Sequence, residues 1–163
     1  YLSTVNFITT ATTVEWARNN GCCIKWICRR VSRSGKLEVL QWVHDEGYNW
    51  DLLVVCRRAA EHGSLNILKW LHANGFTDYH KWLCLWAATF GHVPILEWAY
   101  DNYFGRTKDD LYLAACHHNQ LAVLKWLHEK KHPVWDKALL MSRAKTYKYL
   151  HIIQWIDEEC SES

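Results

Sequence analysis

A short motif near residue 130 contains the residue types that a zinc hydrolase uses. His128, Glu129 and His132 match the H-E-x-x-H pattern, in which the two histidines bind Zn²⁺ and the glutamate acts as general base. That chemistry requires both histidines on one face of a continuous helix. Pro133 follows directly and disfavours helix at the residue before it. We therefore expect no metal here and keep a zinc-dependent hydrolase only as an alternative.

Cys116, His117 and His118 form a second group of potential metal ligands. Adjacent residues of a helix point in different directions, so we expect Cys116 to face a neighbouring helix and only the two histidines to reach the surface. The seven cysteines show no spacing typical of a zinc knuckle. The sequence also lacks a glycine-flanked nucleophile motif and a phosphate loop. We expect no enzyme activity, no cofactor and no small-molecule substrate.

Composition limits the class of partner. The chain has 163 residues, half of them apolar, and 19 Lys and Arg nearly balance 17 Asp and Glu, so no strong basic field attracts nucleic acid. One local basic cluster keeps a nucleic-acid-binding helical repeat as an alternative: Lys25, Arg29, Arg30, Arg33, Arg57 and Arg58. No apolar run approaches the roughly 18 residues of a membrane span, and we expect no membrane partner.

Cysteine usage and the start of the chain give two further expectations. The odd number of cysteines, with no signal peptide before them, indicates a reducing intracellular compartment. We therefore expect a cytoplasmic location. The chain begins at Tyr1 rather than Met, so we expect residues upstream of it.

The elements that position these residues repeat along the chain. Six tryptophans occur in one context, separated by 26, 28, 28, 28 and 29 residues: Trp16, Trp42, Trp70, Trp98, Trp126 and Trp155. Apolar residues lie five and two positions before each of the last five tryptophans, which places an apolar stripe on one helical face. A period of this length predicts a stack of helix pairs in which the tryptophans are core residues.

Other repeated positions predict how each pair is built. Residues seven positions before the tryptophan suit a left-handed helix end: Gly35, Gly63, Gly91 and Asn119, with Lys148 as the irregular case. Residues fourteen positions before it share one apolar slot: Cys28, Cys56, Cys84, Tyr112 and Met141. Small residues such as Ala59 and Ala60 predict close packing between pairs. Acidic residues in the connections, such as Asp51, Asp78 and Asp136, are expected to cap the next helix.

Two runs resemble ankyrin repeats: RAAEHGSLNILKWLHANG from Arg58 and LWAATFGHVPILEWAYDN from Leu85. The resemblance covers about residues 27–160. The usual threonine-proline-leucine-histidine opening is absent, with Trp82, Leu83, Cys84 and Leu85 in its place, and the period is about 28 rather than 33. The chain is similar to divergent, tryptophan-rich arrays common in large DNA viruses and some protists, with shortened loops.

The resemblance implies an all-α, helical-hairpin repeat solenoid forming a single domain over residues 1–163. Residues 1–26 are expected to be an incomplete or capping unit, 27–160 five helix-pair repeats and 161–163 a tail. It also implies a non-catalytic module that binds an unidentified partner protein through its concave face. A structural subunit or scaffold in a larger assembly is the alternative. The expected partner-binding residues are Arg33, Ser34, Glu61, His62, Thr89, Phe90, His117, His118, Thr146 and Tyr147.

Overall fold

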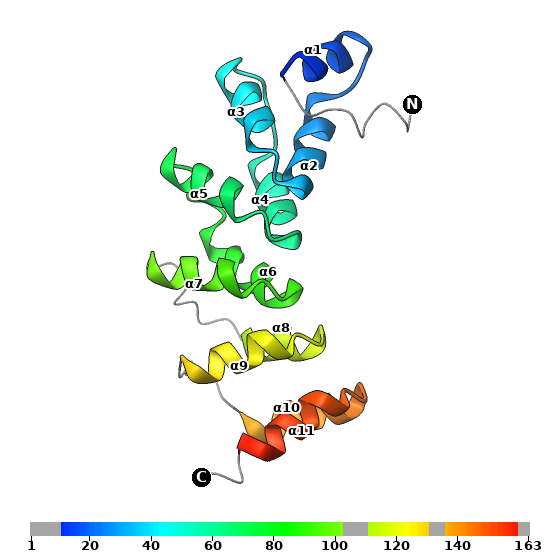
Figure 1. Ribbon diagram of the computed structural model, residues 1–163, viewed down its shortest axis with the longest axis vertical. Coiled ribbons are helices and arrows are strands. Elements are labelled where there is room, and N and C mark those ends of the chain that lie inside the picture. Colours follow the sequence, from blue (N-terminus) through cyan, green and yellow to red (C-terminus); the bar gives the residue numbers. More distant parts are fainter. Residues whose placement is uncertain (1–10, 103–110, 131–135, 160–163) are drawn as a thin grey trace. The chain divides into compact units, whose positions relative to one another are not determined.

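The computed structural model describes residues 11–102, 111–130 and 136–159, which form eleven helices and no strand (Figure 1). The expectation of an all-α protein is therefore confirmed for this part of the chain. The chain divides into two compact units, unit 1 over Tyr1–Tyr79 and unit 2 over His80–Ser163. The more detailed prediction of one domain with five repeats stays a prediction.

Unit 1 contains two complete helix pairs and one further helix. Its helices are α1 (Ala11–Asn19), α2 (Ile24–Ser34), α3 (Leu37–Asp45), α4 (Leu52–Glu61) and α5 (Leu65–Ala73). Helix α2 packs against α3, and α4 packs against α5. The first helices of the two pairs, α2 and α4, also pack against each other, while α1 contacts α3.

Unit 2 contains three helix pairs (Figure 1). Its helices are α6 (His80–Phe90), α7 (Val93–Asp101), α8 (Leu111–His117), α9 (Leu121–Glu129), α10 (Lys137–Thr146) and α11 (Leu150–Glu159). The first helices pack in series, α6 against α8 and α8 against α10, and α7 also contacts α9. Each second helix packs against the first helix that precedes it.

A left-handed residue joins the two helices of every pair. The φ angles are 67° at Gly35, 73° at Gly63, 83° at Gly91, 62° at Asn119 and 57° at Lys148. The expectation of a left-handed helix end at this position is confirmed, and it extends to Lys148. The backbone conformation is thus the same in all five pairs, although the last one has a side chain that disfavours it.

The cysteine slot and the small-residue slots belong to the core. Cys28, Cys56, Cys84 and Tyr112 are buried, and Met141 is half-buried. The alanines that follow in the first helices are fully buried: Ala59, Ala60, Ala87, Ala88 and Ala115. Both packing expectations are confirmed. The cysteines of this slot therefore serve as apolar side chains.

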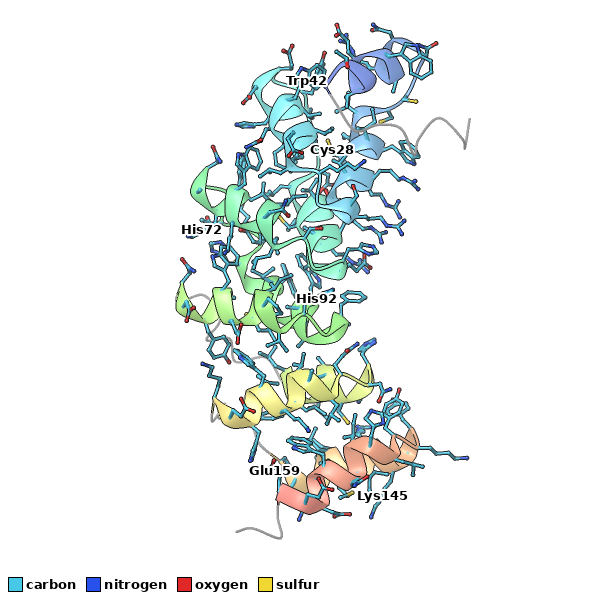
Figure 2. The ribbon with its side chains drawn as sticks, viewed as in Figure 1. Cys28, Trp42, His72, His92, Lys145 and Glu159 are labelled. Atoms are coloured by element: carbon cyan, nitrogen blue, oxygen red, sulfur yellow. The ribbon has the colours of Figure 1, made fainter. Side chains whose placement is uncertain are left out.

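One core position changes character in the last pair. Ser32, Ala60, Ala88 and Cys116 lie ten positions before their tryptophans and are all buried. Cys116 faces the following pair, because its Sγ lies 3.8 Å from the carbonyl oxygen of Leu140 in α10. The equivalent residue of α10 is Lys145, which is exposed (Figure 2). A charged side chain here suits a surface rather than an inter-pair contact.

At the end of each pair opposite its turn, side chains cap the beginning of some first helices and the end of some second helices. Asp51 Oδ1 accepts from the amide of Val54 at 3.0 Å and Asp136 Oδ1 from that of Leu139 at 2.9 Å, so two of the predicted caps are confirmed. At the ends of second helices, three asparagines donate over 2.8 Å to the carbonyl oxygen of the repeat tryptophan four residues earlier: Asn20, Asn74 and Asn102. These bonds satisfy carbonyl groups that a helix end leaves open.

The repeat tryptophans differ in exposure. Trp126 and Trp155 are 5% and 4% exposed, as expected of core residues, whereas Trp42, Trp70 and Trp98 are half-buried. Trp16 is 54% exposed, and for this residue the core prediction is wrong. Trp16 lies in α1, which has no preceding helix pair among the described residues to cover it.

In three cases, an aromatic or histidine residue two positions after a repeat tryptophan packs edge-on against the tryptophan of the next pair. The centroids of His44 and Trp70 are 5.5 Å apart in unit 1, with an interplanar angle of 80°. In unit 2, Tyr100 lies 4.9 Å from Trp126 and His128 lies 5.9 Å from Trp155, both at 85°. Edge-to-face geometry is the favoured arrangement for such rings, so these contacts tie neighbouring pairs together.

In the described part of the chain, no helix combines the length and apolar character that crossing a lipid bilayer requires.

Candidate functional site

The ten expected partner-binding residues all lie where a first helix ends and its turn begins. Seven are exposed: Arg33, Ser34, His62, His117, His118, Thr146 and Tyr147. Glu61, Thr89 and Phe90 are half-buried. We call the six that belong to unit 2 the unit 2 turn surface, made of Thr89, Phe90, His117, His118, Thr146 and Tyr147.

The unit 2 turn surface brings His117 and Tyr147 together. Their ring centroids are 5.5 Å apart at an interplanar angle of 68°, although the residues come from different helix pairs. Tyr147 is 44% exposed and stacks on Tyr149, with centroids 5.6 Å apart at 23°. The ring of Tyr149 is in turn 6.4 Å from that of His151. Four rings thus form a continuous row at the turns of α8/α9 and α10/α11.

A hydrogen bond fixes this row to the backbone. The hydroxyl of Tyr149 donates to the carbonyl oxygen of His117 over 3.3 Å. The position equivalent to Tyr149 in the preceding pair is Gln120, whose Nε2 donates to the carbonyl oxygen of Thr89, also over 3.3 Å. The turns of α8/α9 and α10/α11 are therefore each bonded to the end of the first helix in the pair before. These bonds position the exposed side chains of the unit 2 turn surface.

The serine and the two threonines of the expected site are engaged within their own helices. Thr89 Oγ1 donates to the carbonyl oxygen of Leu85 at 2.7 Å, and Thr146 Oγ1 donates to that of Ser142 at 2.9 Å. Ser34 Oγ donates to the carbonyl oxygen of Val31 at 3.2 Å. The hydroxyls of Ser34, Thr89 and Thr146 are therefore less available to a partner than the side chains of His117, His118 and Tyr147.

In unit 1 the expected residues belong to two consecutive turns, at the ends of α2 and α4. Glu61 pairs with Arg58 in the same helix, with Oε2 and the guanidinium nitrogen 2.5 Å apart. Near Ser34, the side chain of Asn66 donates over 2.7 Å to the carbonyl oxygen of Gly35, joining consecutive turns. Arg33 and His62 are exposed. The basic cluster around them is partly engaged, since the guanidinium of Arg30 lies 5.5 Å from the ring centroid of Trp26.

Charge is distributed unevenly over unit 2. The turn segments 89–95, 117–123 and 143–153 contain no Asp or Glu, but they contain Arg143, Lys145 and Lys148. Within the described ranges, none of these three cations forms an ion pair. Most acidic residues of the described part lie at the other helix ends, including Asp101, Glu129, Asp136 and Glu159. Figure 2 shows Lys145 and Glu159 at opposite ends of the last pair.

The H-E-x-x-H motif does not form a described metal site. Helix α9 ends at Glu129, and His132 lies outside the described residues. The Nε2 of His128 lies 3.5 Å from Oε2 of Glu159, and its ring packs on Trp155. Across the described ranges, no group of three or more His, Cys, Asp or Glu side chains is arranged to hold a metal ion.

Cys116 is separated from the adjacent histidines as expected. Its side chain is buried, and burial raises the pKa of the Cys116 thiol, while His117 and His118 are exposed. Burial likewise raises the pKa of Cys28 to about 12 and that of Tyr112 to about 12. A thiol with a raised pKa has little of the thiolate form that attacks electrophiles or binds metals. These cysteines are therefore suited to packing rather than to chemistry.

Sequence reasoning missed Tyr149, His151, Lys145 and Lys148 as members of the site region. The repeat register contains the necessary signal, because Tyr149 and Gln120 occupy the same position and both reach back by one helix pair. Only the tertiary structure shows that the rings meet.

No protein-family model, curated protein or solved structure matches this chain.

Proposed function

We propose that this protein is an ankyrin-like helical-repeat module that binds a partner protein through its turns, without catalysis. The unit 2 turn surface is the main contact region in this proposal. The observation that carries it is the His117–Tyr147 contact, in which two exposed rings from different helix pairs are held together above a fixed backbone. Tyrosine supplies large contact area and a hydrogen-bonding group at little conformational cost, which is typical of protein interfaces.

The repeated construction supports the solenoid part of the proposal. Five consecutive turns have the same left-handed backbone, while the residues just before that position differ in every pair. Constant turn geometry combined with variable exposed side chains is what a recognition surface on a repeat scaffold requires. The concave face expected of such a solenoid would carry these residues.

The thiols support an intracellular setting. None of the described cysteines forms a disulfide bond, and four of them are buried: Cys28, Cys56, Cys84 and Cys116. Reduced thiols in this number are typical of proteins in a reducing compartment. We place the proposed binding activity in the cytoplasm on this basis.

Affinity capture with two double variants tests the proposed function. The His117→Ala/Tyr147→Ala variant removes the two rings, and Glu129→Ala/Lys130→Ala changes two exposed residues at the opposite end of α9. From a lysate of the source organism, the wild type and the Glu129/Lys130 variant should retain the same partner protein, and the His117/Tyr147 variant should lose it. Unchanged thermal unfolding would show that the loss is not due to misfolding. Equal recovery by all three proteins would refute the proposed surface.

A further inference from the structure

The absence of acidic residues from the turns of unit 2 goes against the preference of the helices themselves. A helix N-terminus favours Asp or Glu in its first turn because of the helix dipole. None of the six helices of unit 2 has an acidic residue there, including α7, α9 and α11, which begin at the turns. The dipole accounts for Arg143 and Lys145 in the last turn of α10, but it does not account for this missing negative charge.

The turn of the last pair also keeps a cation where backbone geometry disfavours it. Lys148 has a φ angle of 57°, at the position where three other pairs have glycine and one has asparagine. A lysine in this conformation is strained relative to either residue. Lys148 adds a second positive charge to that of Lys145 just before α11, and in the sequence it lies between Tyr147 and Tyr149, two members of the ring row.

From this arrangement we infer that the unit 2 turn surface, together with the adjacent Lys145 and Lys148, binds an acidic segment of the partner protein. The two lysines contact its carboxylates. This inference rests on the proposed function and specifies the class of partner. Beside the two lysines, the exposed Tyr147 hydroxyl and the imidazoles of His117 and His151 can each donate a hydrogen bond. Carboxylates accept hydrogen bonds from all of these groups, and charged donors give the stronger bonds.

The ring geometry favours an acidic peptide over single-stranded nucleic acid. Nucleobases bind to aromatic side chains that present a free ring face on which to stack. Tyr147 instead stacks on Tyr149 and packs at 68° against His117, so part of its ring surface is already occupied within the protein. Its hydroxyl can donate a hydrogen bond to a carboxylate.

Two charge-removing variants with matched charge change provide the test. Lys145→Gln/Lys148→Asn removes the turn cations, and asparagine tolerates the left-handed conformation at position 148. Lys130→Gln/Lys137→Gln removes two exposed cations from the opposite end of unit 2, at the end of α9 and the beginning of α10. Binding of a fluorescein-labelled oligoglutamate peptide is measured by fluorescence anisotropy. An oligoglutamine of equal length and a single-stranded oligouridylate serve as comparison probes.

The wild-type protein should bind oligoglutamate and not oligoglutamine. The Lys145/Lys148 variant should bind oligoglutamate about fivefold to tenfold more weakly, and the Lys130/Lys137 variant should equal the wild type. Equal weakening in both variants, or no preference for oligoglutamate over oligoglutamine, would overturn the inference. Tighter binding of oligouridylate, lost in the Lys145/Lys148 variant, would replace it with nucleic-acid binding. If oligoglutamate fails to bind while partner capture still depends on His117 and Tyr147, only the acidic-segment inference is wrong.

Discussion

The side-chain amide of Gln120 occupies the space that a Cβ on Gly91 would need. A Cβ on Gly91 would lie 2.2 Å from Oε1 of Gln120, whose Nε2 donates to the carbonyl oxygen of Thr89. Gly91 therefore serves two purposes: it permits the left-handed turn between α6 and α7, and it leaves space for the hydrogen bond from the next pair.

Gly75 provides a control for this double role. Its φ angle of 80° is nearly equal to the 83° of Gly91, but no atom lies within 4 Å of its Cβ position. Gly75→Ala should lower the free energy of unfolding by about 1–2 kcal/mol, because only the backbone is strained. Gly91→Ala should cost about 1 kcal/mol more, because the Gln120 amide must move and its bond to Thr89 is lost. Urea unfolding followed by circular dichroism gives both values. Equal losses for the two variants would show that the Gln120 bond adds no stability.

Lys148 should be replaceable with a gain in stability. Its left-handed φ angle of 57° strains a residue with a Cβ, so Lys148→Gly should raise the free energy of unfolding by about 0.5–1 kcal/mol after the greater entropy of the unfolded chain is included. Lys145→Gly, inside α10, should instead lower it by about 1 kcal/mol. Thermal and urea unfolding distinguish the two variants. A destabilised Lys148→Gly protein would contradict the strain argument.

Alkaline pH should destabilise the fold. The pKa of Cys28 rises from its ordinary value of 9.0 to about 12 because the thiol is buried, and that of Tyr112 rises from 10.0 to about 12 for the same reason. Above pH 9 the unfolded chain releases the Cys28 proton while the folded chain retains it. Stability is therefore full below pH 9 and falls towards pH 12, by up to about 1.4 kcal/mol per pH unit for each such group.

Urea unfolding from neutral pH to about pH 11 tests this sign and slope. Cys28→Ala should be less stable than the wild type at neutral pH, since it leaves a cavity, but should lose less stability as the pH rises. A wild-type free energy of unfolding that stays constant to about pH 11 would contradict the assignment of Cys28 and Tyr112 to the core.

The repeat spacing predicted the local structure well, because it constrains residues that are close in sequence. The turn conformation at Gly35 and the buried slot of Cys56 follow from periodicity, and both are confirmed. Contacts between pairs were harder to predict from the sequence. The bonds from Tyr149 to His117 and from Gln120 to Thr89 use different side chains at one repeat position, so residue type alone does not predict them.

Burial of the tryptophans was predicted too uniformly for a similar reason. A common sequence context fixes which face of the helix a tryptophan occupies, but not how much of it the neighbouring pairs cover. Trp16 is 54% exposed and Trp126 is 5% exposed for this reason. Likewise, the nearly neutral net charge does not show where the charges lie, so it did not predict that Lys145 and Lys148 are separated from the acidic ends of the unit 2 helices.

Site-specific photo-crosslinking tests the proposed binding surface most directly. The crosslinking residue p-benzoylphenylalanine replaces Tyr147 in one protein and the exposed Lys130, at the opposite end of unit 2, in the other. After irradiation in a lysate of the source organism, position 147 should form a covalent adduct with one partner protein, and position 130 should not. Adducts from position 130 alone, or the same adducts from both positions, would contradict recognition through the turns.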